Sequence, residues 1–461
     1  MLLKTIVSEG LAHHSYLVGG GDEAAIVDPS RDVDRYLEAA SDAGLRITRI
    51  FETHRNEDYI SGACELAQRT GATVWRGRSP DFDVPYAKVA EEGKQFEFGD
   101  LRLKVLYTPG HTDDSISVVL VHTETGDSPV GVFTGDALFV GDVGRTDFYP
   151  DRAEEVAGLL YDSLHDKLLP IGDQAQIWPA HGSGSVCGSG IAKREFSTIG
   201  DERRNNPKLQ LDRKAFIEAK TSEHHYKPPY FERMEAANMG DSPGLQRLPR
   251  PAPLAMQQLE RSLANGAQLL DLRPGQSIAG ACIAEAIAIP LPMLAAFGGW
   301  FLDSQRPIVL LLEQASDRER AVRTLVRIGF ERIDGFLAGG ADSWATAAKP
   351  LQALHGIDVH QLKKRLAGDQ PPLLLDVRSI DEYEQGHIAG AEHHYVGQIE
   401  QKAPDLPRDR PIVTYCKSGK RALVAAAALR RLGHQEVSVC WGSIKAWQAA
   451  GFELTDARKA S

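Results

Sequence analysis

A cysteine beside several cationic residues is the first candidate for chemistry in this chain of 461 residues. Cys416 follows the apolar run 412–415, and a helix is expected to start near Ala422. Ser418 and Gly419 allow a short turn between them, which would direct backbone N–H groups and the positive end of the helix dipole at the sulfur. The cations of this segment are Lys417, Lys420 and Arg421. These features favour thiolate over thiol, so Cys416 is predicted to be a nucleophile.

Histidine and aspartate residues that follow short apolar stretches form a second set of candidates. His54 and Asp58 lie in one segment, His111 lies in Thr-Pro-Gly-His-Thr, Asp136 in Thr-Gly-Asp-Ala, and His181 in Pro-Ala-His-Gly. Imidazole nitrogens and carboxylate oxygens are the donors with which proteins bind zinc and non-haem iron. Each residue taken alone could instead be a structural polar residue, so residue type by itself does not group them into one site.

The composition is that of a globular protein with more than one domain. A single hydrophobic core stops growing near ~250–300 residues, so 461 residues predict two or three domains. The net charge of −11 argues against a nucleic-acid partner and favours a soluble enzyme. No secretory signal and no apolar run of about 18 residues is recognised, so no membrane association is expected. Five cysteines without CxxC spacing suit a reducing cytoplasm.

The first 240 residues read as one unit in which strands alternate with helices. The apolar patterns predict a hairpin at 16–19 with 24–29 and helices at 33–43 and 62–69. They predict further strands at 47–51, 101–106, 116–121 and 177–180. Such an order, with polar loops after the strands, suits a four-layer αββα sandwich. A polar linker is expected from about residue 201, and the Pro- and Gly-rich stretch 241–253 marks the main boundary.

The remaining residues contain an internal repeat. Leu-Leu-Asp-Leu-Arg at 269–273 matches Leu-Leu-Asp-Val-Arg at 374–378, and a Gly- and Trp-containing segment recurs at 337–344 and 440–447. A period of roughly 104 residues indicates a domain duplication, because solenoid repeats are shorter. Each copy alternates apolar strands with amphipathic helices, which is typical of a small α/β domain on a parallel sheet. The predicted domains are 1–240, 250–350 and 355–461.

The second copy resembles the rhodanese (sulfurtransferase) family. Its matching segments are Leu-Asp-Val-Arg at 375–378, Gly-His-Ile-Ala-Gly-Ala at 386–391 and Tyr-Cys-Lys-Ser-Gly-Lys-Arg at 415–421. The first copy resembles this family less completely, because Leu-Glu-Gln-Ala at 312–315 stands where the family has its active-site cysteine. The first copy is therefore expected to be catalytically silent.

The N-terminal unit resembles the persulfide dioxygenases of the metallo-β-lactamase fold. Thr-Pro-Gly-His-Thr at 108–112, Thr-Gly-Asp-Ala-Leu-Phe at 134–139 and Gly-Arg-Thr-Asp-Phe at 144–148 carry the resemblance. One such domain followed by two rhodanese copies is similar to bacterial persulfide dioxygenase–sulfurtransferase fusions. The implied fold class is α/β: a metallo-β-lactamase αββα sandwich followed by two rhodanese-like α/β domains with parallel sheets.

The resemblance implies which residues hold a metal. The family loop has the form T-H-x-H-x-D-H, and this chain has Asn56 and Tyr59 at two of its histidine positions. The implied ligands that remain are His54, His111 and Asp136. Two imidazoles and one carboxylate with open coordination positions favour one Fe(II) ion per domain, with zinc as the alternative metal. The replacements leave a second metal without a full set of ligands.

Other residues near these motifs are expected to support the site. Asp58 and His181 are predicted to hold ligand side chains and waters by hydrogen bonds, and Tyr59 to donate to a bound substrate. Arg145 would fix either the substrate or its own loop. Cys187, in the Gly-rich segment after His181, either carries sulfur as in the similar fusions or has a passive role.

The resemblance implies a bifunctional sulfur-oxidising enzyme. The N-terminal domain would oxidise a low-molecular-weight thiol persulfide with O2 to sulfite, and Cys416 would transfer sulfane sulfur, forming or using thiosulfate. Sequence does not choose the thiol or the direction of transfer, and related multi-domain enzymes make a homo-oligomer plausible. Two alternatives stay open: a zinc thioester hydrolase similar to glyoxalase II with regulatory rhodanese domains, and a persulfide-binding sensor or sulfur carrier.

Overall fold

The computed structural model describes residues 1–80, 83–185, 187–188, 190–241 and 244–455. The chain divides into two compact units, of which one comprises Met1–Leu248 with Arg323–Gly329 and the other Pro249–Val322 with Phe330–Ser461. The division falls at residue 248, inside the Pro- and Gly-rich stretch that marks the predicted main boundary. The finer domain limits of 1–240, 250–350 and 355–461 remain predictions.

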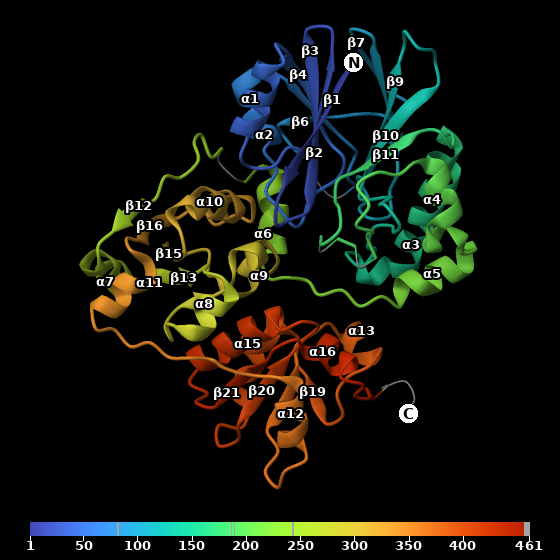
Figure 1. Ribbon diagram of the computed structural model, residues 1–461. Coiled ribbons are helices and arrows are strands. Elements are labelled where there is room, and N and C mark those ends of the chain that lie inside the picture. The colour runs from blue at the N-terminus through green and yellow to red at the C-terminus, as the bar shows by residue number, and fades with distance from the viewer. Residues whose placement is uncertain (81–82, 186, 189, 242–243, 456–461) are drawn as a thin grey trace. The chain divides into compact units, whose positions relative to one another are not determined.

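Two β-sheets form the centre of the first unit (Figure 1). The first sheet has the order β1-β2-β3-β4-β5-β6, with strands Leu2–Ser8, His13–Gly20, Glu23–Val27, Arg46–Glu52, Thr73–Arg76 and Ala87–Val89. The second has the order β11-β10-β9-β8-β7, and β7 to β11 are Gln95–Phe98, Leu101–Tyr107, Ile116–His122, Pro129–Gly135 and Gln176–Pro179. Strands β3 to β6 run parallel, as do β10 and β11, whereas β7 to β10 are antiparallel.

Alternating side chains explain why the two sheets pack face to face. In β3, Ala25 and Val27 point into the core between the sheets, while Ala24 and Ile26 face the helical layer. Helices α1 (Asp34–Asp42) and α2 (Ala63–Thr70) cover this outer face of the first sheet. Helices α3 (Ala153–Asp162) and α5 (Arg213–Thr221) cover the second sheet. The predicted four-layer αββα sandwich is confirmed.

Two short helices and part of α5 occupy the segment that the sequence analysis read as a linker. Helix α4 is Ile199–Asn205 and α6 is Phe231–Ala236. The Thr198 side chain accepts a hydrogen bond from the Asp201 N–H at the start of α4, and Asp212 caps α5 in the same way. Such N-caps stabilise helix starts within polar sequence. The linker expected over 201–213 was therefore wrong, because α4 and the start of α5 lie there.

The second unit contains two five-stranded sheets of parallel strands with the same topology. Their orders are β12-β16-β15-β13-β14 and β17-β21-β20-β18-β19. Strands β12 to β16 are Ala252–Leu254, Gln268–Asp271, Ile287–Ala288, Ile308–Leu311 and Ile333–Leu337; β17 to β21 are His355–Ile357, Leu373–Asp376, Ala391–His393, Ile412–Tyr415 and Val437–Cys440. Each strand from β12 to β16 thus has a counterpart at the same place in the sheet formed by β17 to β21. This correspondence is the repeat that the sequence shows.

Helices accompany the strands of each copy. Helices α7 to α11 are Met256–Ala264, Gly275–Gly280, Leu294–Phe301, Arg318–Arg327 and Gly340–Thr346. Helices α12 to α16 are Val359–Leu366, Ile380–Glu384, Ile399–Lys402, Lys420–Arg431 and Ser443–Ala449. The predicted pair of small α/β domains with parallel sheets is therefore confirmed.

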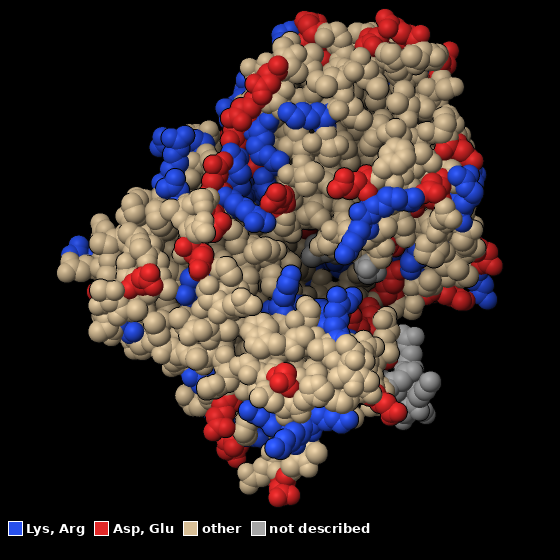
Figure 2. Space-filling model, viewed as in Figure 1, with Lys and Arg blue, Asp and Glu red and all other residues tan. Residues whose placement is uncertain are grey.

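The surface carries charges of both signs. Figure 2 shows Lys and Arg in small groups among Asp and Glu on the face in view. Among the described residues, no helix has both the length and the apolar character that crossing a membrane requires.

Gly135, the last residue of β10, tests how tightly the strand ends pack. Its φ is +53°, and an added Cβ would lie 2.6 Å from Thr53 Oγ1. Gly135→Ala should destabilise the first unit by more than ~2 kcal/mol, because backbone strain adds to overpacking. Chemical denaturation followed by circular dichroism measures this loss.

Gly44 is the matched control for that substitution. Its φ is +66°, but an added Cβ would meet no atom within 4 Å. Gly44→Ala should cost only the strain, about 1 kcal/mol. Equal losses for the two variants would contradict the close approach of Thr53 and Gly135.

Candidate metal centre and sulfur-transfer loop

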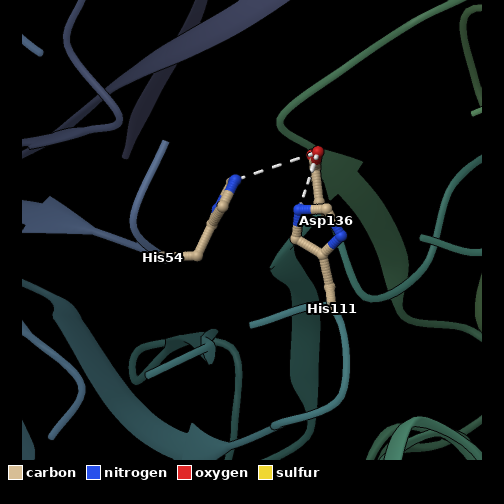
Figure 3. Close-up of side chains that lie close together, drawn as sticks. All are labelled: His54, His111 and Asp136. Carbon is tan, nitrogen blue, oxygen red and sulfur yellow. Dashed lines mark ion pairs between the residues drawn. The ribbon is translucent and has the colours of Figure 1, made fainter. Parts of the chain in front are cut away.

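Strand ends of the first unit bring His54, His111 and Asp136 together. The three follow β4, β8 and β10, and each is at most 2% exposed. Figure 3 shows both imidazoles turned toward the carboxylate: Asp136 Oδ2 lies 3.8 Å from Nε2 of His54 and 3.6 Å from Nε2 of His111. One potential donor atom from each residue lies within 4.8 Å of the others. The residues that the sequence motifs grouped therefore share one site.

Hydrogen bonds at the opposite ring nitrogens determine which atoms face this site. His54 Nδ1 lies 2.8 Å from Thr53 Oγ1, and that hydroxyl donates its own proton to Asp28 Oδ2 at 2.8 Å. His111 Nδ1 lies 2.9 Å from the carbonyl oxygen of Arg145. Both partners can only accept, so each Nδ1 carries the proton and each Nε2 presents a lone pair when the ring is neutral. Metal-binding histidines are typically held in this way.

The lone pairs test whether the residues fit a metal ion. His54 Nε2 and His111 Nε2 are buried and have no hydrogen-bond partner among the described residues. Burial holds the pKa of His54 below its ordinary value, which favours the neutral ring that binds metals. Metal–ligand bonds of about 2.0–2.2 Å place donor atoms up to ~4 Å apart, so the separations of 3.6 and 3.8 Å suit a shared cation. The site therefore fits a metal.

His181 supports Asp136 from the far side. Its Nδ1 lies 2.8 Å from Oδ1 and 3.0 Å from Oδ2 of Asp136. Burial alone would raise the pKa of Asp136, but His181 and His54 hold that pKa well below its ordinary range. Burial alone would lower the pKa of His181, but Asp136 and Asp58 raise it well above. This contact matches the supporting role predicted for His181.

Asp58 lies at the opposite ring edge of His181, with its Oδ2 3.1 Å from Nε2, and Cys187 lies near both residues. The three residues place potential metal-binding atoms within 4.8 Å of one another, and all three are buried. Neither carboxylate oxygen of Asp58 has a hydrogen-bond partner among the described residues. The hydrogen bonds predicted for Asp58 are thus not seen in the described part of the chain. Burial, followed by the charge of Asp58, raises the pKa of the Cys187 thiol well above its ordinary value, which disfavours a nucleophilic thiolate.

Glu57 is a residue that the sequence analysis missed. Its side chain is 1% exposed, and its Oε1 lies 3.5 Å from His111 Nε2. The same oxygen lies 3.8 Å from Cys187 Sγ. Although burial acts to raise the pKa of Glu57, His111 lowers it below its ordinary value. Only its place between two motif residues could have pointed to it, so Glu57 adds a carboxylate to the same pocket.

Asn56 and Tyr59 help to shape the loop. Asn56 Nδ2 lies 3.3 Å from the His54 carbonyl oxygen. Asn238, from a part of the chain far along the sequence, donates to the carbonyl oxygens of Asn56 and Tyr59 at 2.6 and 2.8 Å. The Tyr59 ring packs on His13 with centroids 4.1 Å apart, and its buried hydroxyl has no hydrogen-bond partner among the described residues. Asn238 carries no sequence signal that would reveal this function.

The side chain of Arg145 binds its own loop. Its Nε and Nη2 each lie 2.6 Å from one oxygen of Asp147, and Arg145 is 1% exposed. Its guanidinium lies over Phe148, whose ring in turn meets the His111 ring edge-on. Arg145 was predicted to fix either the substrate or its own loop, and this geometry favours the second role. The carbonyl oxygen of Arg145, in that loop, accepts the hydrogen bond from His111 Nδ1.

The Cys416 loop lies between β20 and α15 in the second unit. Cys416 Sγ accepts a hydrogen bond from the Gly419 N–H at 3.1 Å, and the Cys416 N–H donates to Ser443 Oγ at 3.1 Å. Gly419 has a φ of +102°, and α15 begins directly after it at Lys420. The helix thus starts two residues before the expected Ala422, which brings its N-terminus closer to the sulfur.

The three loop cations have different surroundings. Lys417 and Lys420 are exposed, as is Ser418. Arg421 is tied to Glu382 through two contacts, at 2.5 and 2.9 Å. The two lysines are therefore the loop cations with exposed side chains, and Arg421 links the loop to the Glu382 helix.

In the first copy, Leu312 follows β15 at the position of Cys416. The registers agree, because Asp271 pairs with Leu311 as Asp376 pairs with Tyr415. Cys282, the cysteine of this copy, is buried, and burial raises the pKa of its thiol to about 11. These observations support the prediction that the first copy is catalytically silent.

Family models match both parts of the chain. The metallo-β-lactamase superfamily model matches residues 9–181, and the rhodanese-like domain model matches residues 358–450. The matches include every predicted ligand of the metal centre and the whole Cys416 loop.

Individual relatives differ in activity. The mitochondrial persulfide dioxygenase ETHE1 of Bos taurus is 28% identical, with 52% of this chain and 88% of that protein aligned. A hydroxyacylglutathione hydrolase of Synechococcus sp. (strain JA-2-3B'a(2-13)) is 31% identical, with 44% of this chain and 86% of that protein aligned. A solved metallo-β-lactamase of Staphylococcus aureus subsp. aureus COL has a TM-score of 0.65 and 29% identity and covers 73% of this chain and 98% of its own.

These similarities agree with the αββα sandwich, the buried donor cluster and the cysteine loop. The resemblance to both families that the sequence motifs indicated is confirmed. The chain therefore belongs to the metallo-β-lactamase superfamily, with persulfide dioxygenases among its relatives, and continues into a C-terminal rhodanese-like domain.

Proposed function

We propose that this protein oxidises a low-molecular-weight thiol persulfide with O2 and transfers sulfane sulfur through Cys416. The overall oxidation is R–S–SH + O2 + H2O → R–SH + sulfite + two protons. The observation that carries the proposal is the convergence of His54, His111 and Asp136 with both Nε2 lone pairs directed inward. The similarity to a persulfide dioxygenase supports the same reaction class.

His54, His111 and Asp136 would hold one Fe(II) ion, which would supply the redox chemistry between O2 and the terminal sulfur. Thr53 and the Arg145 carbonyl orient the two imidazoles, and His181 orients the carboxylate. Burial of all three ligands limits the access of water to the reacting sulfur. The protein thus supplies a fixed, dry set of donors that leaves the other positions to the substrates.

The sulfur transfer requires only Cys416 and its loop. The Cys416 thiolate attacks the sulfane sulfur of a donor, the donor leaves as its anion, and a Cys416 persulfide forms. Sulfite then takes the outer sulfur to give thiosulfate and regenerates the thiolate. The Gly419 N–H faces the sulfur, and the exposed Lys417 and Lys420 can attract the anionic partners.

A second candidate is a zinc-dependent thioester hydrolase with regulatory rhodanese domains. The similarity to a hydroxyacylglutathione hydrolase favours it, and Asp58 and His181 are buried beside the first cluster. This hydrolase would need two cooperating cations. Thioester hydrolysis by the zinc-loaded protein, without persulfide-dependent O2 uptake, would establish this alternative.

Removal of one ligand tests the oxygenase. His111→Ala should abolish O2 uptake with glutathione persulfide, because Nε2 of His111 is one of three donors. An oxygen electrode with iron-reconstituted protein measures the rate, and His122→Ala, at the last residue of β9, is the control. Undiminished uptake by the His111 variant would refute the assigned site.

Removal of the thiol tests the transferase. Cys416→Ser should retain O2 uptake but shift the product from thiosulfate to sulfite, because no residue of the loop can then carry sulfane sulfur. Quantification of both anions by chromatography measures the shift. Thiosulfate formation equal to that of the parent protein would show that Cys416 is not the carrier.

Loss of the Thr53 hydroxyl tests the orientation of His54. In Thr53→Val the acceptor of the Nδ1 proton is missing, while the side-chain volume is nearly unchanged. The affinity for Fe(II) should fall about 10- to 100-fold, as is usual when the partner of a metal-binding histidine is lost. Competition with a chelator measures the affinity, and an unchanged value would contradict this role for Thr53.

A further inference from the structure

We infer that Ser443 is a positioning residue for sulfur transfer, because its hydroxyl fixes the direction in which the Cys416 sulfur points. Ser443 is buried and begins α16, 27 residues after Cys416 in the sequence. It therefore lies outside the loop whose motif indicated a transferase. The inference rests on the transferase half of the proposed function and adds to it a residue that the motif does not contain.

The strained backbone of Ser443 is the first observation behind this role. Its φ is +48°, a left-handed conformation in which a residue with a Cβ is strained. Glycine adopts the same conformation without strain, so a serine at this position has a cost that a glycine would not have. Strained residues persist only where the surrounding structure holds them, and they gather at functional positions. The contact that a glycine could not make here is the one through the hydroxyl.

The hydroxyl of Ser443 joins the ends of two neighbouring strands. It donates its proton to the Cys440 carbonyl oxygen at 2.7 Å, so its lone pairs can accept the Cys416 N–H at 3.1 Å. The Ile444 N–H donates to the Cys416 carbonyl oxygen, also at 3.1 Å. Consecutive residues of one turn thus bind the backbone of Cys416 on both sides of its Cα. These contacts fix the Cα–Cβ bond and hold the sulfur 3.1 Å from the Gly419 nitrogen.

The same turn holds the rest of the loop. The Lys445 N–H donates to the Lys417 carbonyl oxygen at 3.1 Å. A Cβ added at Gly419 would lie 2.9 Å from the Trp441 ring, so this ring lies close against the end of the loop. The side chains of Lys417 and Lys420 are exposed and take no part in these contacts. The turn therefore sets the position of the sulfur, while the lysine side chains attract the anionic substrate.

The first copy provides a comparison within the same chain. Its segment 337–344 corresponds to 440–447, so Gly340 stands where the second copy has Ser443. The φ of Gly340 is +58°, which is the same left-handed conformation without the strain. The turn is thus kept in both copies, whereas the hydroxyl and its strain occur only in the copy whose loop contains Cys416. This difference links Ser443 to the cysteine rather than to the fold.

Transfer from thiosulfate to cyanide by the full-length protein is the reaction that tests this role. The Cys416 thiolate attacks the sulfane sulfur of thiosulfate, and sulfite leaves as a Cys416 persulfide forms. Cyanide then takes the outer sulfur to give thiocyanate and regenerates the thiolate. Both steps require an aligned sulfur, and a misplacement of about 1 Å can cost ~100-fold in rate. Loss of the positioning contact should therefore lower kcat and leave the KM for thiosulfate unchanged.

Two variants separate the hydroxyl of Ser443 from its backbone strain. Ser443→Ala removes the hydroxyl and keeps the strained Cβ, whereas Ser443→Gly removes both. Each should lower kcat about 10- to 100-fold with an unchanged KM. Ser443→Gly should nevertheless have the higher denaturation midpoint of the two, because its strain is relieved. A residue that served only the fold would instead give transfer rates in the order of the stabilities.

A matched control and a direct readout of the sulfur complete the test. Gly340→Ser introduces the same strain at the corresponding turn of the first copy, and it should leave kcat and KM unchanged. Alkylation of Cys416 by iodoacetamide, followed by mass spectrometry, measures the reactivity of the sulfur without any transfer. Its rate should fall at least about tenfold in both Ser443 variants, because the Gly419 N–H is then no longer held against the thiolate. The control should be alkylated at the parent rate.

The contrary results are equally defined. Transfer at the parent rate by Ser443→Gly would mean that the turn needs no hydroxyl, and a raised KM with an unchanged kcat would mean that Ser443 affects donor binding. Either result would overturn the inference, as would unchanged alkylation in both variants. Absence of transfer in the parent protein would refute the proposed transferase instead, and the alkylation rates would then decide on Ser443 alone.

Discussion

The first unit depends on buried imidazoles and carboxylates whose charges balance one another only in part. The ion pairs of Asp136 are made with three imidazoles, His54, His111 and His181. Moving a carboxylate out of water costs several kcal/mol, and it is recovered only if positive charge lies close by. Protons on the imidazoles or a metal ion can supply that charge. Since the Nδ1 atoms of His54 and His111 are hydrogen-bonded on the side away from the cluster, their Nε2 atoms face Asp136.

A polar scaffold beneath the loop keeps these atoms in place. Arg76 lies 2.5 Å from Asp114, and the other oxygen of Asp114 accepts from the Arg55 N–H next to His54. Asn238 holds the far end of the same loop through two carbonyl oxygens. Buried ion pairs add little net stability, but breaking one costs about 3–5 kcal/mol. Their effect here is to give the metal loop one conformation, because any other would leave these buried groups without partners.

The sequence predicted the elements better than the contacts between them. Strands β4, β8, β9 and β11 were located within a few residues, since β-branched and apolar runs mark buried strands. Helices α4 and α5 were missed because their capping residues lie in polar sequence, and α6 was missed because no side chain caps its start. The metal ligands could be named only because their motifs resemble a family. Glu57 was missed altogether, and Cys187, although named, could not be placed beside Asp58 and His181, since that contact depends on how loops from two sheets meet.

Comparison of the two copies in the second unit distinguishes interactions that stabilise the fold from residues that could react. Arg273 contacts Asp271 and the Ala281 carbonyl oxygen, and Arg378 makes the same contacts with Asp376 and the Gly386 carbonyl oxygen. Both copies keep this buried pair at the end of a central strand, so it belongs to the scaffold.

The residue that follows the neighbouring strand has changed from cysteine to leucine between the copies. Leu312 is 5% exposed and Cys416 is 1% exposed, so each fills its position. The copies share their topology but differ in this loop, where Leu-Glu-Gln-Ala at 312–315 corresponds to Cys-Lys-Ser-Gly at 416–419, so the residues proposed for sulfur transfer belong to one loop on a shared scaffold. In the first unit, too, the strands supply the framework, and the potential donors His54, His111 and Asp136 lie in the loops that follow them.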